Sequence, residues 1–200
     1  MKGQNIILAG VGGQGIVFAG NILGLAAMKQ GFDVKKTDTL GMAQRGGSVV
    51  THLRYGEKVF SPSIKKGDAD IIIAFEKLEA ARWIEYLKTG GIVFINDLAI
   101  PPLSAHLGTD KYPGDNEITS IINKKTGKIC ILDAAKSAEE LGNPLLVNTI
   151  LLGFTLPSLS IEEVFIKEAL TEALPQKVAE LNIKALKKGW SLSTPSRPHL

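Results

Sequence analysis

Six residues near the N-terminus, Gly10-Val-Gly-Gly-Gln-Gly15, have the glycine spacing of a phosphate-binding turn. They follow an apolar run and open a helical pattern, which is the context that such a turn requires. Glycine lets the backbone approach a pyrophosphate, and the N-terminus of the next helix offers N–H groups and about half a positive charge to an anion. The polar Gln14 and the extra Gly13 favour a turn that faces a ligand. The alternative is a glycine turn that only permits tight strand-helix packing.

A dinucleotide site also needs an acidic residue about 20 residues further on, which binds the ribose. Asp38, at the end of the second predicted strand, is the better candidate, and Asp33 is the weaker one. A stand-alone NAD-dependent oxidoreductase would use Asp38 together with the glycine turn. It would also need a substrate lobe and a catalytic base, and neither is recognisable.

A second polar, glycine-rich segment, Thr39–Ser48, follows the second predicted strand. Loops after the carboxyl ends of parallel strands collect at one edge of a sheet, so this segment should stand beside the glycine turn. Arg45, followed by Gly46 and Gly47, can present a guanidinium fork and backbone donors to a phosphate or carboxylate. Alternatively, Arg45 satisfies loop carbonyls or pairs with a carboxylate of a neighbouring subunit. The candidate binding residues are Gly10, Gly12, Gly13, Gln14, Gly15, Gln44, Arg45, Gly46, Gly47 and Ser48.

No self-sufficient catalytic set is recognisable, and no catalytic residue is predicted. His52 falls on a strand and is interpreted as a structural or interface side chain, while His106 and His199 lie in irregular segments. No Ser-His-Asp order is recognisable, and the G-x-S-x-G motif is absent.

Four other polar residues are weaker candidates. Asp68 and Asp70 precede a strand and are interpreted as turn and cap residues, and Glu76 at the end of that strand is a minor candidate for the crevice edge. Asn148 lies in an apolar helix and must find a partner. We expect Asn148 to tie a loop carbonyl rather than to contact a ligand.

The elements that position these residues alternate between strand and helix, which predicts an α/β, Rossmann-like, open and mostly parallel sheet with helices on both faces. Apolar runs predict strands at 5–9, 32–37, 49–55, 70–75, 92–95 and 128–132. Periodic patterns predict helices at 15–30, 77–88, 134–141, 143–156, 161–174 and 175–188. Residues 101–116, with three prolines, predict an irregular connection.

The last third of the chain predicts a helical C-terminal extension. Ser160-Ile-Glu-Glu163 matches a capping box, and Gly189 is interpreted as a helix stop. We expect residues 1–190 to form one domain and residues 191–200 to form a tail that lies on its own domain or on a neighbouring chain.

Composition excludes several classes. The 200 residues are 44% hydrophobic and 22% charged, with a net charge of +3, which is too weak to indicate a nucleic-acid surface. One Cys and three His cannot supply an internal disulfide or a four-ligand zinc site. The apolar run at 6–9 is far shorter than the ~20 residues of a membrane span, and it lacks signal-peptide flanks. We expect a cytoplasmic protein without a membrane or nucleic-acid partner.

The sequence resembles the gamma-type domain of 2-oxoacid:ferredoxin oxidoreductases in several segments taken together. These are Gly10–Gly15, Ala19–Leu23, Ala26-Ala27 and above all Gly41–Ser48 with 49–54. The resemblance extends from the first strand to Gly153. Members that act on pyruvate or 2-oxoglutarate often carry a Tyr-Gly-Pro-Glu-like approach to the Arg-Gly-Gly motif. Leu40-Gly-Met-Ala-Gln44 stands in that place, so the sequence is most similar to the beta subunit of indolepyruvate ferredoxin oxidoreductase.

The resemblance implies oxidative decarboxylation of an aryl 2-oxoacid, with coenzyme A accepting the acyl group and ferredoxin taking two electrons. It also implies that thiamine diphosphate, magnesium and the iron–sulfur clusters belong to a large partner subunit. A single Cys cannot hold a Cys₄ cluster, and no thiamine diphosphate motif is present. We therefore expect one inactive subunit of a split enzyme, which reaches ferredoxin through the complex and self-associates or exposes a large apolar area when its partner is missing. Coenzyme A at the crevice is the implied ligand, and a purely structural subunit is the remaining alternative.

Overall fold

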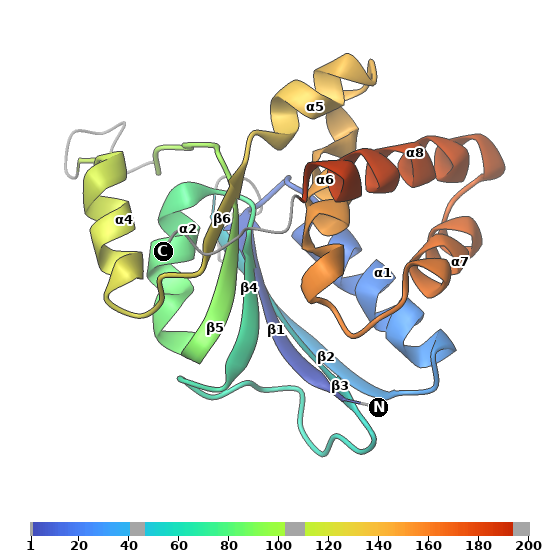
Figure 1. Cartoon of the computed structure of the whole chain (residues 1–200), viewed down its shortest axis with the longest axis horizontal. Coiled ribbons are helices and arrows are strands. Elements are labelled where there is room, and N and C mark those ends of the chain that lie inside the picture. Colours follow the sequence, from blue (N-terminus) through green and yellow to red (C-terminus); the bar gives the residue numbers. More distant parts are fainter. Residues whose placement is uncertain (1, 41–46, 103–110, 194–200) are drawn as a thin grey trace.

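The computed structural model describes residues 2–40, 47–102 and 111–193. Within these ranges, six strands form one sheet in the order β2-β3-β1-β4-β5-β6 (Figure 1). The strands are β1 (Gln4–Val11), β2 (Asp33–Leu40), β3 (Ser48–Gly56), β4 (Ala69–Ala74), β5 (Leu87–Asn96) and β6 (Ile129–Leu132). Each predicted strand is present.

The sheet is mixed, because β3 runs antiparallel to both of its neighbours, β1 and β2. The pairs β1-β4, β4-β5 and β5-β6 are parallel. The connection between β2 and β3 is too short for a helical crossover, so the chain returns in the opposite direction and inserts β3 between β2 and β1. The prediction of a mostly parallel sheet is confirmed, and the carboxyl ends of β1, β2, β4 and β5 meet at one edge together with the start of β3.

Helices cover both faces of the sheet, as predicted (Figure 1). The helices and 3₁₀ turns are α1 (Ile16–Lys29), α2 (Lys77–Trp83), η1 (Ile84–Tyr86), α4 (Asp115–Asn123), α5 (Ala134–Glu140), η2 (Pro144–Leu146), α6 (Val147–Thr155), η3 (Leu156–Ser158), α7 (Glu163–Ala173) and α8 (Gln176–Leu192). One face packs against α1, α6, α7 and α8, and the opposite face packs against α2, η1 and α4.

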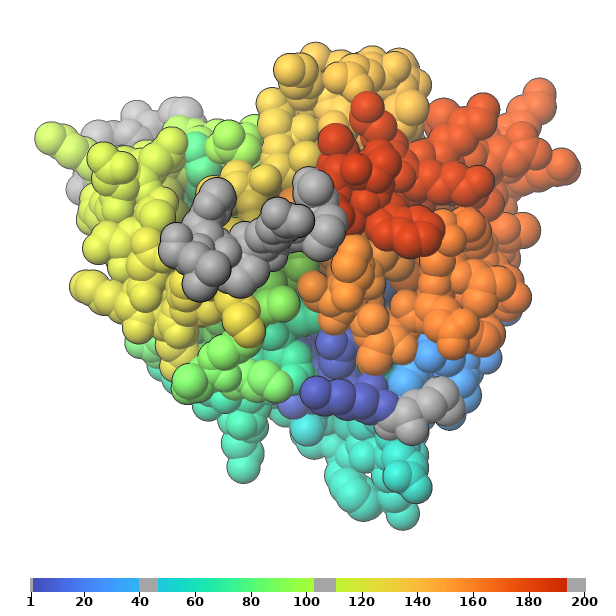
Figure 2. Space-filling model, viewed as in Figure 1, coloured from blue at the N-terminus to red at the C-terminus, as the bar shows by residue number. Residues whose placement is uncertain are grey.

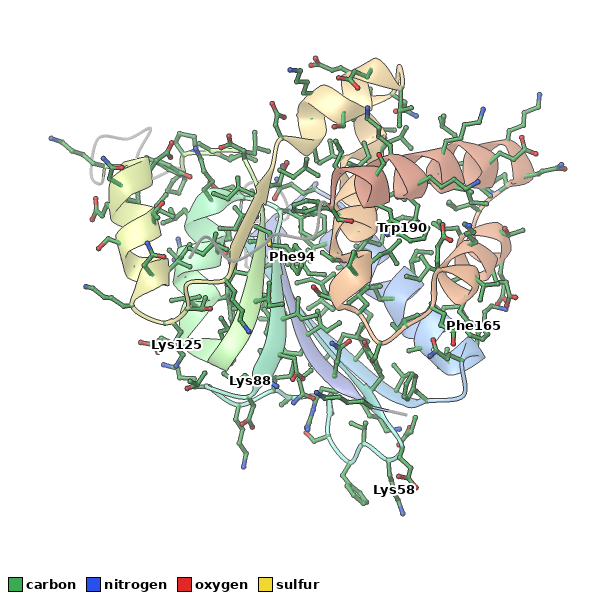
Figure 3. The ribbon with its side chains drawn as sticks, viewed as in Figure 1. Lys58, Lys88, Phe94, Lys125, Phe165 and Trp190 are labelled. Carbon is green, nitrogen blue, oxygen red and sulfur yellow. The ribbon has the colours of Figure 1, made fainter. Side chains whose placement is uncertain are left out.

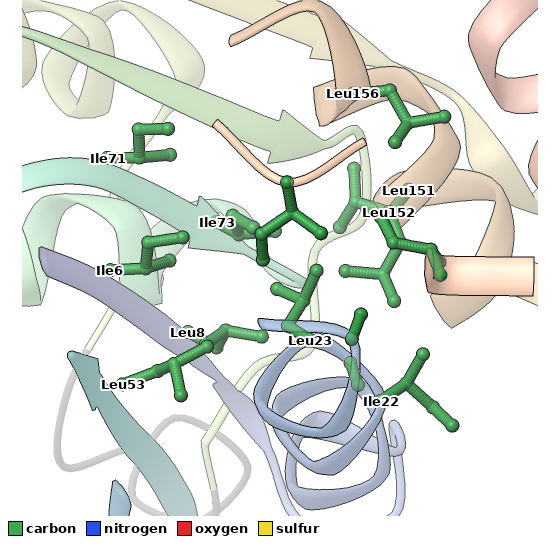
Figure 4. Close-up of a cluster of buried hydrophobic side chains, with 14 of the residues drawn as sticks. Ile6, Leu8, Ile22, Leu23, Leu53, Ile71, Ile73, Leu151, Leu152 and Leu156 are labelled. Carbon is green, nitrogen blue, oxygen red and sulfur yellow. The ribbon is translucent and has the colours of Figure 1, made fainter. Parts of the chain in front are cut away.

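The larger core lies between the sheet and the C-terminal helices (Figure 4). Leu8 and Ile73, both fully buried, face Leu23 of α1 and Leu151 of α6 in this layer. Alternate residues of the same strands, such as Ile7 and Ile72, enter the core on the other face. Burial on both faces explains why these strands read as continuous apolar runs. The C-terminal helices therefore complete the main core.

Two glycines let α6 and α8 cross with their backbones in contact. A Cβ on Gly153 would lie 2.1 Å from the carbonyl oxygen of Leu186, and one on Gly189 would lie 1.9 Å from that of Ile150. The interpretation of Gly189 as a helix stop is wrong, because α8 continues to Leu192. Gly189 is required at the helix crossing instead of at a helix end.

Three other local expectations need correction. α7 begins at Glu163 without a side-chain cap, because Ser160 is used elsewhere: its amide donates to Gln4 Oε1 at 2.8 Å. α2 ends at Trp83, and β5 already begins at Leu87. The helix α4 was not predicted, since it follows a proline-rich stretch and offers only a short apolar pattern.

The segment between β3 and β4 lies at the end of the strands opposite the glycine turn, and it protrudes at the bottom of the molecule (Figure 2). Hydrogen bonds to β2 and β3 anchor it: the amide of Val59 donates to Asp33 Oδ2 at 2.8 Å, and Arg54 Nη1 donates to the carbonyl of Ser61 at 3.0 Å. Phe60 is nevertheless 85% exposed, with the Lys58 ammonium 5.2 Å from its ring centre. This segment therefore exposes an aromatic side chain to solvent while hydrogen bonds hold its backbone in place.

Candidate functional site

The glycine turn connects β1 to α1 at the edge where the parallel strands end. Gly13 and Gly15 have φ values of 105° and 80°, which are strained for any residue with a side chain. The amide of Gly12 donates to the carbonyl of Gly47 at 2.8 Å, and Val11 pairs with Ser48 across the sheet. The glycine turn and the end of the Thr39–Ser48 segment are therefore in direct contact.

Gln14 closes the turn from inside. Its Oε1 accepts the Val11 amide at 2.7 Å, and its Nε2 donates to the carbonyl of Phe75 at 2.9 Å. A Cβ on Gly10 would lie 2.7 Å from Gln14 Oε1 and 2.9 Å from Phe75 Cβ, so close packing explains that glycine. The side chain of Gln14 thus shapes the turn, and its contact with a ligand stays a prediction.

Two backbone amides of the glycine turn are available as hydrogen-bond donors. In the described part of the chain, no group accepts a hydrogen bond from the amide of Gly13 or Gly15. The first turn of α1 contains no acidic residue, and Gly15 provides no side-chain cap. The positive end of the helix dipole is therefore not compensated from within the first turn of α1, which favours an anion at this position.

Asn148, at the start of α6, lies against the glycine turn. A Cβ on Gly15 would lie 2.4 Å from Asn148 Nδ2. Asn148 Oδ1 accepts the amide of Thr149 at 2.7 Å, and Thr149 Oγ1 donates to Asn182 Oδ1 in α8 at 2.6 Å. The side-chain oxygen therefore accepts a hydrogen bond from its own helix, and the Nδ2 donor, the group that would tie a loop carbonyl, faces the turn.

Two buried carboxylates at the start of α2, one of them on the N-cap residue, border the same edge. Glu76 is 1% exposed; it caps α2 by accepting the amide of Glu79 at 2.9 Å, and it also accepts the Tyr112 hydroxyl at 2.5 Å. Burial, reinforced by the Glu76 carboxylate, raises the pKa of Tyr112. Glu79 is 4% exposed and accepts the Ser48 hydroxyl at 2.5 Å. Sequence reasoning missed Glu79, because a glutamate in a helix usually faces solvent.

The acidic candidates for a ribose partner lie away from the glycine turn. Asp38 accepts the Thr51 hydroxyl at 2.6 Å and pairs with Lys36, and the inserted β3 separates its strand from β1. Asp33 lies at the opposite end of β2 and accepts the amide of Val59. Neither carboxylate is brought to the glycine turn, which removes the main support for a dinucleotide site.

Two further sequence candidates have structural partners. His52 Nδ1 accepts the amide of Ile64 at 3.1 Å, and burial lowers the pKa of its imidazole. Asp70 accepts the amide of Asn5 at 2.7 Å and pairs with Lys88. These contacts make both residues supports of the sheet.

Several predicted residues lie outside the described ranges: Gln44, Arg45, Gly46, His106 and His199. Within the described ranges, no group of three or more His, Cys, Asp or Glu side chains is arranged to hold a metal ion. Among the helices of this part of the chain, none has the length and apolar character needed to span a bilayer.

Comparison with known proteins identifies the family. The model of the pyruvate ferredoxin/flavodoxin oxidoreductase family matches residues 5–192. The chain belongs to this family. Within it, the chain is 41% identical to the indolepyruvate oxidoreductase subunit IorB of Pyrococcus horikoshii, and the match covers 94% of this chain and 95% of that subunit.

Two solved structures of the oxidoreductase family share the fold. The gamma subunit of a keto/oxoacid ferredoxin oxidoreductase from Geobacter sulfurreducens superposes with a TM-score of 0.69 at 21% identity, covering 95% of this chain and 98% of that one. The 2-oxoglutarate:ferredoxin oxidoreductase from Magnetococcus marinus, solved with 2-oxoglutarate, coenzyme A and succinyl-CoA bound, gives a TM-score of 0.72 at 22% identity. That match covers 96% of this chain and 31% of the other, so in that protein the fold is one part of a longer polypeptide.

Proposed function

We propose that the chain is the subunit of an indolepyruvate:ferredoxin oxidoreductase that carries neither thiamine diphosphate nor iron–sulfur clusters. The 41% identity to an IorB subunit over nearly the whole of both chains supports this assignment. The segment Leu40–Gln44, which replaces the Tyr-Gly-Pro-Glu-like approach of the pyruvate and 2-oxoglutarate types, supports it independently. The reaction is oxidative decarboxylation of an aryl 2-oxoacid to its acyl-CoA ester and CO₂, with two electrons passed to ferredoxin.

The partner subunit holds the redox groups in this assignment. A chain with one Cys has too few thiolates for an iron–sulfur cluster. Thiamine diphosphate and the clusters would supply decarboxylation and electron transfer from the large subunit. The present chain would bind and orient the acyl acceptor, coenzyme A.

The crevice between Gly12–Gly15 and Gln44–Ser48 is the proposed coenzyme A site, with the phosphates at the glycine turn. The Gly12 to Gly47 hydrogen bond of 2.8 Å carries this proposal, because it brings the two segments together. The amides of Gly13 and Gly15 offer oriented hydrogen-bond donors. Arg45 would add a full positive charge and could bind a phosphate through two parallel hydrogen bonds. Gly10 and Gln14 would hold the turn in shape.

The test is an Arg45→Ala variant of this chain in the assembled enzyme. Loss of a charge-assisted hydrogen bond should raise the coenzyme A concentration needed for half-maximal rate by about ten- to a hundredfold. Lys125→Ala is a matched control: Lys125 (Figure 3) precedes β6, at the end of the parallel strands opposite the glycine turn, and loss of this positive charge should change nothing. An unchanged coenzyme A requirement together with dissociation of the subunits would make Arg45 an interface residue and favour a structural subunit.

A further inference from the structure

Glu79 is a carboxylate whose burial needs an explanation. It lies in the first turn of α2 and is 4% exposed, and the helix cap is supplied by Glu76. Removing a carboxylate from water is costly unless hydrogen bonds and an opposite charge compensate. An apolar residue would fill the same volume without this cost, so the contacts of the two carboxylate oxygens matter.

Within the described ranges, each oxygen of Glu79 has one partner. Oε1 accepts Arg82 Nε at 3.0 Å, which offsets the negative charge. Oε2 accepts the hydroxyl of Ser48 at 2.5 Å. Ser48 is the first residue of β3, and the preceding residue, Gly47, accepts the amide of Gly12. Glu79 is therefore two residues removed, through Ser48 and Gly47, from the glycine turn.

We propose that Glu79 is a positioning residue that holds the start of β3 against the glycine turn. By holding Ser48 in place, Glu79 also positions the carbonyl of Gly47, which accepts the hydrogen bond from the Gly12 amide. It thereby sets how closely the start of β3 approaches the glycine turn. The hydrogen-bonding part stands on geometry alone; its consequence for coenzyme A rests on the function proposed above.

Charge and positioning give opposite expectations for substitutions at Glu79. If the negative charge acted mainly by repelling an anionic ligand, both Glu79→Gln and Glu79→Ala would bind coenzyme A more tightly. If Glu79 acts by holding Ser48, Glu79→Gln keeps an acceptor and stays close to the parent enzyme, whereas Glu79→Ala binds more weakly. The two variants separate the explanations without a structure of the complex.

A measurement without ligand tests the positioning directly. Hydrogen exchange of the Gly12 amide in the full chain should accelerate by about tenfold or more in Glu79→Ala and in Ser48→Ala, the factor expected for one lost charge-assisted hydrogen bond. The double variant should add little, because both changes break the same contact. Glu85→Ala removes an exposed carboxylate from the turn after α2 and is the matched control, which should exchange like the parent chain. Ser48→Ala leaves α2 untouched, so it keeps the test decisive if Glu79→Ala folds poorly.

In the assembled enzyme, Glu79→Ala should raise the KM for coenzyme A by about tenfold with a smaller change in kcat, and Glu79→Gln should restore most of it. Unchanged Gly12 exchange in both Glu79→Ala and Ser48→Ala would overturn the positioning role. Glu79→Ala can also accelerate Gly12 exchange and leave the KM for coenzyme A unchanged. If Arg45→Ala then has no effect on that KM either, Glu79 remains a positioning residue but the coenzyme A site is rejected. Tighter binding in both Glu79 variants would show that charge dominates and would also overturn the proposal.

Discussion

Replacing Gly15 by alanine should weaken the fold through two separable effects. The residue has a φ of 80°, and an L-residue in this left-handed conformation costs about 1–2 kcal/mol. The added Cβ would also lie 2.4 Å from Asn148 Nδ2, which is roughly 1 Å short of van der Waals contact. Asn148 can retreat only by disturbing the hydrogen bond from the Thr149 amide, worth about 1 kcal/mol. We expect the free energy of unfolding to fall by about 2–3 kcal/mol in total.

Urea denaturation of the full chain, followed by circular dichroism, measures this loss. Gly13→Ala is the matched control, since Gly13 also has a positive φ but a Cβ there would meet no atom within 4 Å. It should cost only the backbone strain. Combining Gly15→Ala with Asn148→Ala should relieve the contact and give a coupling energy of about 1 kcal/mol. Equal losses for Gly13→Ala and Gly15→Ala, with no coupling to Asn148, would refute the contact.

Three further changes test other parts of the structure. Burial lowers the pKa of His52 below its ordinary 6.5, so folding favours the neutral imidazole. The free energy of unfolding should therefore fall as the pH drops through 6.5. In denaturation measured at several pH values, His52→Gln should lack this decrease. Gly189→Ala should cost about 3 kcal/mol in the same assay, because its Cβ would press on the Ile150 carbonyl; a loss near that of an ordinary surface substitution would mean that α8 can shift. Phe60→Ala should leave the fold intact but weaken association with the proposed large subunit by about tenfold in sedimentation. Leu145→Ala, at 81% exposure, is its control, and equal effects of the two substitutions would deny Phe60 a special role.

The strands and the edge where they end could be predicted from the sequence, because burial on both faces leaves continuous apolar runs such as Ile71–Ile73. The helix crossing could not. A glycine that ends a helix and one that lets two helices touch look the same in one segment, and only Gly153 on the facing helix distinguishes them. The capping box at Ser160 failed for a similar reason, since a distant residue, Gln4, takes its polar groups.

The candidate site was predictable to the level of segments. Glycine spacing and sheet topology indicated that the two polar loops would adjoin, and the Gly12 to Gly47 contact now joins them. The roles of individual side chains depend on contacts between residues far apart in the chain. Gln14 turns inward, and Glu79 accepts a hydrogen bond from Ser48, which lies 31 positions away. A helical glutamate gives no local signal of burial, so only packing could reveal it.

Reconstitution of the enzyme from separately purified chains tests the assignment as an oxidoreductase subunit most directly. With indolepyruvate and coenzyme A present, reduction of ferredoxin or of a viologen dye should require both this chain and the large subunit, and this chain alone should show no turnover. Turnover by this chain alone, or full activity of the large subunit without it, would contradict the assignment.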